Sequence, residues 1–243
     1  MAKFGLLGRD IGYSFSKTFF SVKFENESLP HSYHNFDMPS IENFETFIAE
    51  NPDIKGMNVT IPYKEEIIPH LFNLDKESKI IGAVNTIKFR KDGKLIGYNT
   101  DHYGFAKALI EFLPLKNKTA LILGTGGASK AIKYVLDAME FQYYSVSRKA
   151  EEDILSYSQL TKDIVENHYL IINCTPLGTT PNTNEAPEIP YQFVGKDHVL
   201  FDLIYNPRMT EFMKLGTSKG ARVCNGLNML KHQALKSWAV WNS

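Results

Sequence analysis

Residues 119–129 read TALILGTGGAS, in which a short apolar run leads into a loop with three glycines. The apolar run predicts a buried strand of a parallel sheet, and residues 129–139 continue with a helical pattern of apolar residues. Glycines permit a tight turn from strand to helix, and they let the backbone approach a phosphate at the helix N-terminus. The stretch therefore predicts a dinucleotide-binding loop, with an ordinary strand-to-helix turn as the alternative.

Short strands and helices alternate on both sides of this loop. Downstream, the pattern predicts strands at 143–146, 169–173, 199–203 and 222–224, and helices at about 101–112, 210–219 and 228–241. Upstream, it predicts strands at 3–7, 32–36 and 56–60, helices at 16–26 and after Ser40, and a hairpin at Asp92-Gly93. We therefore expect an α/β protein, with an N-terminal α/β part and a doubly wound Rossmann-type sheet from about residue 101 onward.

The composition excludes several classes of protein. The 243 residues carry 27 Lys and Arg against 27 Asp and Glu, so the formal net charge is zero. This balance argues against a large nucleic-acid-binding surface and against an acidic disordered tail. The two cysteines, Cys174 and Cys224, argue against a disulfide framework and against a cysteine metal site. We see no signal peptide and no membrane-spanning apolar run, which favours a cytoplasmic protein without a membrane partner.

The residues after the second strand of the doubly wound part bear on the choice of nucleotide. An acidic residue at this place usually binds the ribose hydroxyls of NAD, whereas this chain has Val146-Ser147-Arg148-Lys149. The two cations can pair with the 2′-phosphate of NADP. We therefore predict NADP rather than NAD, with a solvated surface loop as the alternative interpretation.

Polar side chains gather at the ends of the upstream elements. Asn58 and Thr60 share one strand face, and Lys64 follows in the first turn of a helix, where the helix dipole disfavours a cation. Asn85 and Asp101 also fall at element ends, where α/β folds place their sites. A carboxylate keeps a neighbouring lysine cationic, and such a lysine can protonate an oxygen that becomes an alkoxide. Spacing alone leaves open that Lys64 and Asp101 are unrelated surface residues.

Nine short segments follow one another along nearly the whole chain. They are residues 14–16 (SFS), 58–64 (NVTIPYK), 82–86 (GAVNT), 99–101 (NTD), 124–129 (GTGGAS), 173–178 (NCTPLG), 202–207 (DLIYNP), 226–230 (GLNML) and 233–234 (QA). Each segment alone is a modest signal. In this order, they resemble the shikimate dehydrogenase family.

The resemblance implies an NADP-dependent oxidoreductase that reduces 3-dehydroshikimate to shikimate in aromatic amino acid biosynthesis. It implies a substrate-binding and catalytic domain over residues 1–100, an NADP-binding Rossmann domain over 101–225, and a C-terminal helix, 226–243, that packs back on the first domain. The active site would be the cleft between the domains. The partner would be a small-molecule substrate, and the enzyme would be a monomer or a homodimer.

The resemblance also implies roles for single residues. Lys64 would be the general acid/base with Asp101 as its partner, and the hydroxyls of Ser14 and Ser16 would hold the substrate carboxylate. The ring hydroxyls and ketone would be bound by Thr60, Asn85, Asp101 and Gln233, with Asn58 and Tyr205 nearby. The pyrophosphate would lie on Gly124, Thr125, Gly126, Gly127 and Ala128, the 2′-phosphate on Ser147, Arg148 and Lys149, and the nicotinamide against Leu203, Gly226 and Met229.

The chain departs from the family pattern in three segments. Lys17 follows the Ser14–Ser16 segment where the family has proline, and Phe20-Ser21 stands in place of a His-Asn pair. Ser147 and Lys149 flank Arg148 where the family has asparagine and threonine, and Ser129 takes the third position of the glycine loop. Two other functions stay open, namely a quinate/shikimate dehydrogenase and a non-catalytic sensor that binds shikimate.

Overall fold

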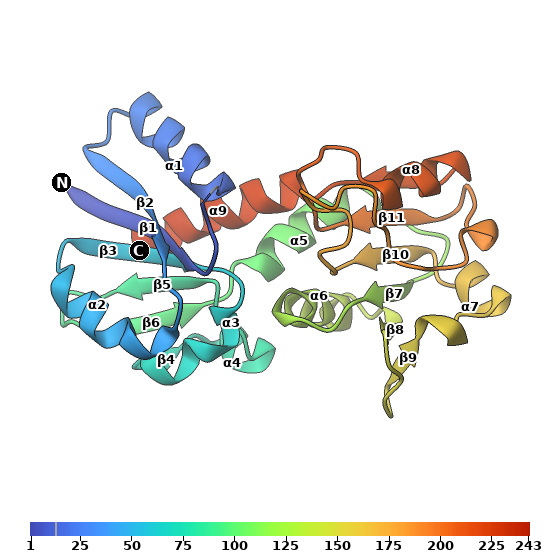
Figure 1. The fold of residues 1–243 in the computed structure, drawn as a ribbon, viewed down its shortest axis with the longest axis horizontal. Coiled ribbons are helices and arrows are strands. Elements are labelled where there is room, and N and C mark those ends of the chain that lie inside the picture. The colour runs from blue at the N-terminus through green and yellow to red at the C-terminus, as the bar shows by residue number, and fades with distance from the viewer. Residues whose placement is uncertain (13) are drawn as a thin grey trace. The chain divides into compact units, whose positions relative to one another are not determined.

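The computed structural model describes residues 1–12 and 14–243, and this part of the chain divides into two compact units (Figure 1). The first unit contains residues 1–103 and 233–243, and the second contains residues 104–232. Two helices, α5 (Asp101–Ile110) and α9 (Leu227–Trp241), begin in one unit and end in the other. Each unit folds around a sheet of its own.

A mixed sheet forms the centre of the first unit, and its described strands follow the order β2-β1-β3-β5-β6-β4. These strands are β1 (Ala2–Gly8), β2 (His31–Asp37), β3 (Ile54–Val59), β4 (Asn73–Leu74), β5 (Thr86–Phe89) and β6 (Leu95–Tyr98). β1 pairs in parallel with β2 and β3, whereas β5 runs antiparallel to β3 and β6. The β5–β6 pair confirms the hairpin predicted at Asp92-Gly93, where Gly93 has a φ of +80°.

Short helices connect these strands. They are α1 (Phe15–Asn26), α2 (Phe44–Glu50), α3 (Tyr63–Glu66) and α4 (Lys76–Ile81), with 3-10 turns at Ile41–Asn43 and Ile68–His70. One face of the sheet buries Leu7 and Met57 against Phe44 of α2 and Tyr63 of α3. This packing places the start of α3 directly after β3, where the polar segment 58–64 lies.

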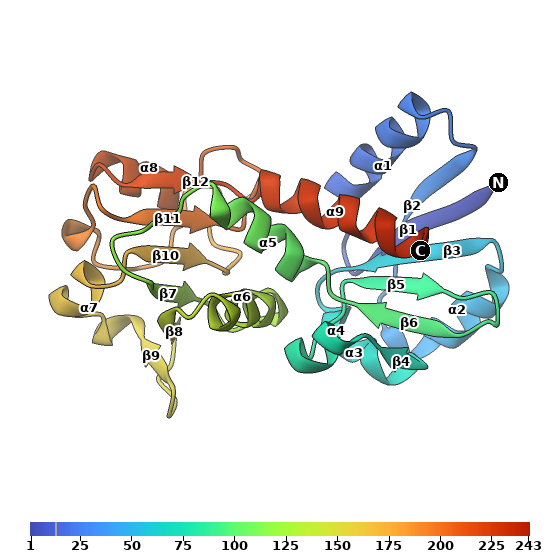
Figure 2. The same cartoon turned by 180° about the vertical axis from the view of Figure 1, so that it is seen from behind.

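The end of α9 packs on the first sheet, as Figure 2 shows. The ring of Phe4 lies 5.5 Å from that of Trp238 and 4.9 Å from that of Trp241, between centroids. A Cβ atom at Gly56 would lie 2.6 Å from the indole ring of Trp241. Because that distance is far below a normal contact, only glycine at position 56 allows α9 to approach β3 so closely.

The second unit has an all-parallel sheet with the described strand order β12-β11-β10-β7-β8-β9. Its strands are β7 (Thr119–Leu123), β8 (Gln142–Ser147), β9 (Ile154–Ser156), β10 (Leu170–Asn173), β11 (Val199–Asp202) and β12 (Arg222–Cys224). The strand order reverses between β7 and β10, which is the topological switch point of a doubly wound fold. The predicted α/β class with a Rossmann-type sheet is therefore confirmed.

Helices cover both faces of the second sheet. They are α6 (Gly127–Ala138), α7 (Lys162–Glu166) and α8 (Glu211–Ser218), with 3-10 turns at Tyr157–Gln159 and Tyr191–Phe193. Ala120 and Ile122 pack with α5 and α6, whereas Leu121 and Leu123 pack with α7 and α8. Alternate residues of β7 are thus buried on opposite faces, which explains why residues 120–123 are all apolar.

Several predicted boundaries move by a few residues. The helix expected at residue 129 begins at Gly127, because Gly126 is already its N-cap. The strand expected at 199–203 ends at Asp202, and the helix expected up to residue 112 ends at Ile110. β4, β9, α4 and α7 were not predicted, since each is too short to show periodicity. Within the described residues, every helix is too short or too polar to span a bilayer.

We expect Gly56→Ala to lower the free energy of unfolding by about 1–3 kcal/mol, because the new methyl group would overpack the indole of Trp241. Urea denaturation followed by tryptophan fluorescence measures this change, since both tryptophans, Trp238 and Trp241, belong to the first unit. Gly12→Ala is the control, because Gly12 also belongs to the first unit and a Cβ there would meet nothing within 4 Å. Equal stability of the two variants would contradict the close approach.

Candidate active site

Lys64 and Asp101 form a direct ion pair in the first unit. The Lys64 Nζ atom lies 2.7 Å from Asp101 Oδ2, and the two side chains are 16% and 9% exposed. Lys64 is the second residue of α3, and Asp101 is the first residue of α5, where the helix dipole favours an anion. The ion pair offsets the unfavourable position of the cation at the start of α3, so the two residues are not unrelated surface groups.

Asn85 holds the other oxygen of the same carboxylate. Its Nδ2 donates to Asp101 Oδ1 at 2.8 Å and to Gln233 Oε1 at 3.3 Å. Its Oδ1 accepts from the backbone N–H of Thr100 at 2.6 Å, and this contact fixes the orientation of the amide. Both carboxylate oxygens of Asp101 therefore have donors, and the carboxylate cannot turn away from Lys64 without losing one of them.

A cluster of buried hydroxyls contacts Asn85 and so supports the Lys64–Asp101 ion pair. Thr86, Thr100 and Ser237 lie within 2.8–3.2 Å of one another, oxygen to oxygen. Asn58 Nδ2 donates to Ser237 Oγ, to Thr86 Oγ1 and to the Asn85 carbonyl, at 3.0–3.1 Å. The phenol of Tyr33 donates to Asn58 Oδ1 at 2.8 Å. The amide of Asn58 is thus fully engaged within the protein, and it orients the cluster.

Ser14 and Ser16 lie at the start of α1. Ser14 is the N-cap, and its Oγ accepts from the N–H of Lys17 at 3.1 Å and donates to Asn35 Oδ1 at 2.8 Å. Asn35 Nδ2 donates to the Ile11 carbonyl, so its Oδ1 can only accept. Ser16 is 8% exposed and lies against the phenol of Tyr33. A ligand carboxylate would have to draw the Ser14 proton away from Asn35.

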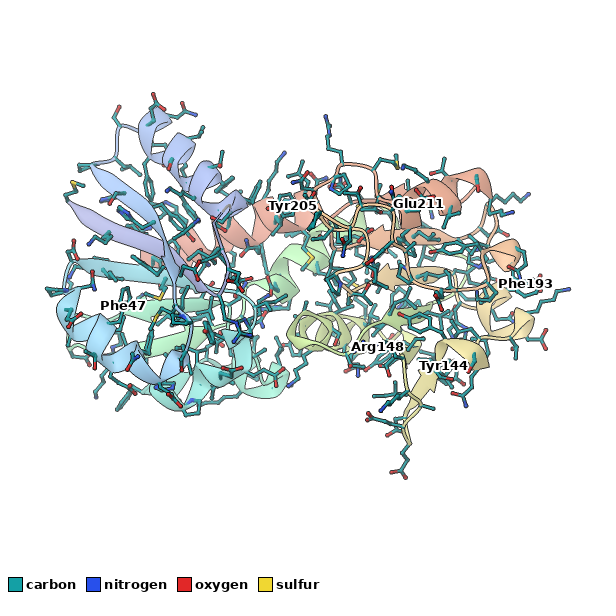
Figure 3. The ribbon with its side chains drawn as sticks, viewed as in Figure 1. Phe47, Tyr144, Arg148, Phe193, Tyr205 and Glu211 are labelled. Atoms are coloured by element: carbon teal, nitrogen blue, oxygen red, sulfur yellow. The ribbon has the colours of Figure 1, made fainter. Side chains whose placement is uncertain are left out.

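The remaining predicted substrate residues lie in two places. Thr60 follows β3, and its methyl group contacts Gly8, where a Cβ would come within 2.6 Å. Gln233 is 5% exposed and accepts from Thr100 Oγ1 at 3.3 Å. Tyr205 belongs to the second unit, in the segment that follows β11 (Figure 3). The structure thus joins Asn58, Lys64, Asn85, Asp101 and Gln233 in one network of the first unit.

Tyr33, Asn35, Thr86, Thr100 and Ser237 contribute to the site without having been assigned a role from the sequence. Thr86 and Thr100 lie inside segments 82–86 and 99–101, in which the predicted site residues are their neighbours Asn85 and Asp101. Ser237 lies one helical turn after Gln233, and its hydroxyl donates to the Gln233 carbonyl. The four-residue spacing from Gln233 along α9 could have indicated Ser237 as a site residue. Tyr33 and Asn35 lie in no recognised segment, so the sequence did not indicate them.

The glycine loop has the backbone geometry of an anion site. Gly124 has a φ of +100°, and a Cβ there would lie 3.0 Å from the methyl group of Thr175 and 3.3 Å from the Cys174 backbone. Thr125 and Gly126 are exposed at the start of α6. Ser129, one of the departures, closes the loop from inside, with its N–H and Oγ both on the Gly126 carbonyl at 2.9 and 2.7 Å. The loop therefore fits a bound pyrophosphate.

Ser147, Arg148 and Lys149 form a tight turn at the end of β8. The Ser147 hydroxyl donates to the Lys149 carbonyl at 2.5 Å and accepts from the Lys149 N–H at 3.2 Å. Arg148 and Lys149 are exposed, as Figure 3 shows for Arg148. Over residues 1–12 and 14–243, neither side chain forms an ion pair with a carboxylate. Both cations are available to an anionic ligand such as a phosphate.

The residues expected near the nicotinamide lie around the end of β11. A Cβ at Gly226 would lie 2.1 Å from the Leu203 carbonyl oxygen, and the Gly226 N–H donates to the Ile204 carbonyl at 3.0 Å. Met229 is 6% exposed and belongs to the core cluster with α5 and α6. Burial raises the pKa of the Cys174 thiol, so it stays protonated and serves the structure.

Fold and site together define a two-unit α/β protein with a glycine loop at the N-terminus of a helix and a partly buried lysine–aspartate pair. The family model described as "Shikimate dehydrogenase substrate binding domain" matches residues 6–87. A shikimate dehydrogenase (NADP(+)) of Clostridium perfringens is 36% identical, covering 100% of this chain and 93% of its own length. One of Methanococcus maripaludis is 38% identical, with coverages of 98% and 90%.

A solved structure shows the same likeness in three dimensions. Shikimate 5-dehydrogenase of Thermus thermophilus, in complex with NADP(H) and shikimate, superposes with a TM-score of 0.88 at 28% identity. The match covers 99% of this chain and 93% of that one. The chain belongs to the shikimate dehydrogenase family, which confirms the resemblance seen in its sequence.

We expect Ser237→Ala to lower the free energy of unfolding of the first unit by about 1–3 kcal/mol, because three buried polar groups lose a partner. Urea denaturation followed by tryptophan fluorescence measures it. Ser21→Ala is the control, since Ser21 is exposed and also belongs to the first unit. The polar network would not depend on Ser237 if both variants unfolded like the wild type.

Proposed function

We propose that this protein is an NADP-dependent shikimate dehydrogenase, which reduces 3-dehydroshikimate to shikimate in the biosynthesis of aromatic amino acids. The observation that carries the proposal is the Lys64–Asp101 ion pair, buried in a polar network, in a chain that matches relatives of this name over nearly its full length. The predicted enzyme class and cofactor agree with the names of these relatives.

Lys64 acts as the general acid in the reduction. Asp101 holds its Nζ at 2.7 Å as an ammonium group, which can donate a proton to the ketone oxygen of the substrate. In the reverse reaction, the neutral amine takes the proton back from the hydroxyl group. Asn85 keeps the carboxylate in place, so the lysine remains oriented through the cycle.

The polar residues of the first unit suit a small polyhydroxy acid. Ser14 and Ser16 bind the carboxylate through their hydroxyls, at the start of α1. Thr60, Asn85, Asp101 and Gln233 bind the ring hydroxyls and the ketone, with Asn58 as their support, and Tyr205 is a further substrate-binding residue. A site built on hydrogen bonds rejects an analogue that lacks a hydroxyl, because a buried polar group would then lose its partner.

The second unit holds the cofactor. The backbone at Gly124, Thr125, Gly126, Gly127 and Ala128 binds the pyrophosphate, since Gly124, with a φ of +100°, allows the tight turn from β7 and α6 presents its N-terminal N–H groups. Bound NADPH supplies the hydride.

Specificity for the phosphate of NADPH comes from the turn after β8. Arg148 and Lys149 pair with the 2′-phosphate, and Ser147 holds the turn in shape. At the other end of the cofactor, Leu203, Gly226 and Met229 line the nicotinamide.

These roles divide between the units. We assign substrate binding and catalysis to residues 1–103 with 233–243, and cofactor binding to residues 104–232. The match of residues 6–87 to a substrate-binding domain supports the first assignment. A monomeric or homodimeric state and a cytoplasmic location stay predictions from the sequence.

Lys64→Ala should lower kcat by about 10²–10⁴-fold, because general acid catalysis contributes about that much. The dissociation constant of NADPH should not change, since Lys64 belongs to the other unit. Steady-state rates come from the absorbance of NADPH with 3-dehydroshikimate as substrate. Lys55→Ala, at an exposed lysine of β3, is the matched control and should turn over like the wild type. Full turnover by Lys64→Ala would remove the lysine from the mechanism.

Arg148→Ala should raise the KM for NADPH by about 10–100-fold, since a hydrogen-bonded ion pair to phosphate is lost. The KM for NADH, which has no 2′-phosphate, should stay the same. Lys162→Ala, at an exposed lysine of α7, is the control and should change neither constant. An equal rise of the KM for NADPH and for NADH would mean that Arg148 does not bind the 2′-phosphate.

The two other functions are separated by the same assays. A quinate/shikimate dehydrogenase would oxidise quinate at a rate that matches shikimate. A non-catalytic sensor would bind shikimate without hydride transfer, although the intact Lys64–Asp101 pair and glycine loop argue against that.

A further inference from the structure

Asp202 is a buried carboxylate at the carboxyl end of β11, in the second unit. The residue is completely buried, and its Oδ1 accepts from Asn173 Nδ2 at 3.1 Å and from the Ile204 N–H at 3.0 Å. Its Oδ2 accepts from the Thr210 hydroxyl at 2.6 Å. These three donors come from the ends or flanks of three different elements: β10, the segment after β11, and α8.

In the part of the chain that the structure describes, this carboxylate has no positively charged partner. Within residues 1–12 and 14–243, it forms no ion pair. Its negative charge contributes to the raised pKa of Cys174, Tyr191 and Cys224, none of which carries a positive charge. Burial raises the pKa of Asp202 to about 6, and the hydrogen bonds from Thr210, Ile204 and Asn173 oppose that rise. Burying a charge without a cation costs desolvation free energy. An apolar residue would fill the same space without that cost, so a purely structural role does not account for a carboxylate here.

Asn173 connects Asp202 to the glycine loop. With its Nδ2 on Asp202, Asn173 turns its Oδ1 to the N–H and the hydroxyl of Thr175, at 3.0 and 2.6 Å. The methyl group of Thr175 in turn lies against Gly124, where a Cβ would come within 3.0 Å. The position of the loop that receives the pyrophosphate therefore depends on a chain of contacts that starts at Asp202.

The segment after β11 depends on the same carboxylate. Asp202 binds the Ile204 N–H, and the Leu203 N–H donates to the Asn173 carbonyl at 3.1 Å. The Leu203 and Ile204 carbonyls then meet Gly226, one by close approach and the other by a hydrogen bond. Leu203 and Gly226 are the residues proposed for the nicotinamide end of the cofactor.

We propose that Asp202 is a positioning residue for the cofactor, which sets the loops after β10 and β11 so that both ends of NADPH find their sites. This inference rests on the proposed function, because it takes NADPH as the ligand of the second unit. Asp202 acts through Asn173 and the Ile204 backbone, and it does not itself touch the reacting atoms. It lies at the carboxyl ends of the strands, where open α/β sheets bind their ligands.

The test compares Asp202→Ala with Asp202→Asn by titration of NADPH fluorescence and by steady-state kinetics. Asp202→Ala should weaken NADPH binding by about tenfold or more, because three hydrogen bonds to the carboxylate are lost. The KM for 3-dehydroshikimate should stay within about twofold, since the substrate residues belong mainly to the first unit. Asp202→Asn should restore binding to within about threefold, because the amide oxygen can still accept from Asn173 and Ile204.

A second pair of variants tests the same inference if Asp202→Ala does not fold. Thr210 and Thr161 both cap a short helix of the second unit, each accepting a backbone N–H at 3.3 Å, but only Thr210 also donates to Asp202. Thr210→Ala should weaken NADPH binding by about threefold or more, and Thr161→Ala should leave it unchanged.

The outcomes separate the inference from the proposed function. NADPH binding by Asp202→Ala like that of the wild type, or equal effects of the two threonine variants, would overturn the positioning role. If the wild-type protein did not bind NADPH at all, the proposed function would be overturned by that measurement alone, without the variants.

Discussion

The carboxylate of Asp101 is the constraint on which the candidate active site depends. Its side chain is 9% exposed, and a carboxylate removed from water needs a cation or a hydrogen-bond donor on each oxygen. Lys64 satisfies one oxygen from α3, and Asn85 satisfies the other from the segment before β5. Asn85 also brings in Gln233 of α9. One buried charge thus brings three segments, far apart in the chain, to one point, and this fixes the orientation of Lys64, the proposed general acid.

The second unit solves the same problem in a different way. Asp202 is also buried, but it is satisfied by three neutral donors rather than by a cation. These neutral donors connect the segments after β10 and β11 without a second buried charge. The exposed cations of the proposed phosphate site, Arg148 and Lys149, lie elsewhere in the unit, in the turn after β8. The two carboxylates therefore differ in their partners: Asp101 pairs with a lysine, whereas Asp202 binds neutral groups of the loops around it.

Much of the site could be predicted, because its chemistry resides in short segments with unusual residues. Lys64 at the start of a helix and Arg148 after a strand stand out where another residue would be expected. Tyr33, Asn35 and Ser237 could not be predicted, because each is an ordinary polar residue within its own element. Ser237 acquires its role through Asn58, which lies 179 positions earlier in the chain. Only the register of β3 and the packing of α9 bring these two residues together.

By itself, the sequence determined the α/β class, the glycine loop at residues 124–129 and the family, because periodicity and short motifs are local properties. It also pointed to Lys64 and Asp101, but not to their contact. Only the tertiary structure decided which buried polar groups satisfy one another, and hence that Asn58 supports the site and that Asp202 joins the loops of the second unit. The physical reason is that such hydrogen bonds depend on strand register and helix packing, which arise from contacts between residues distant along the chain.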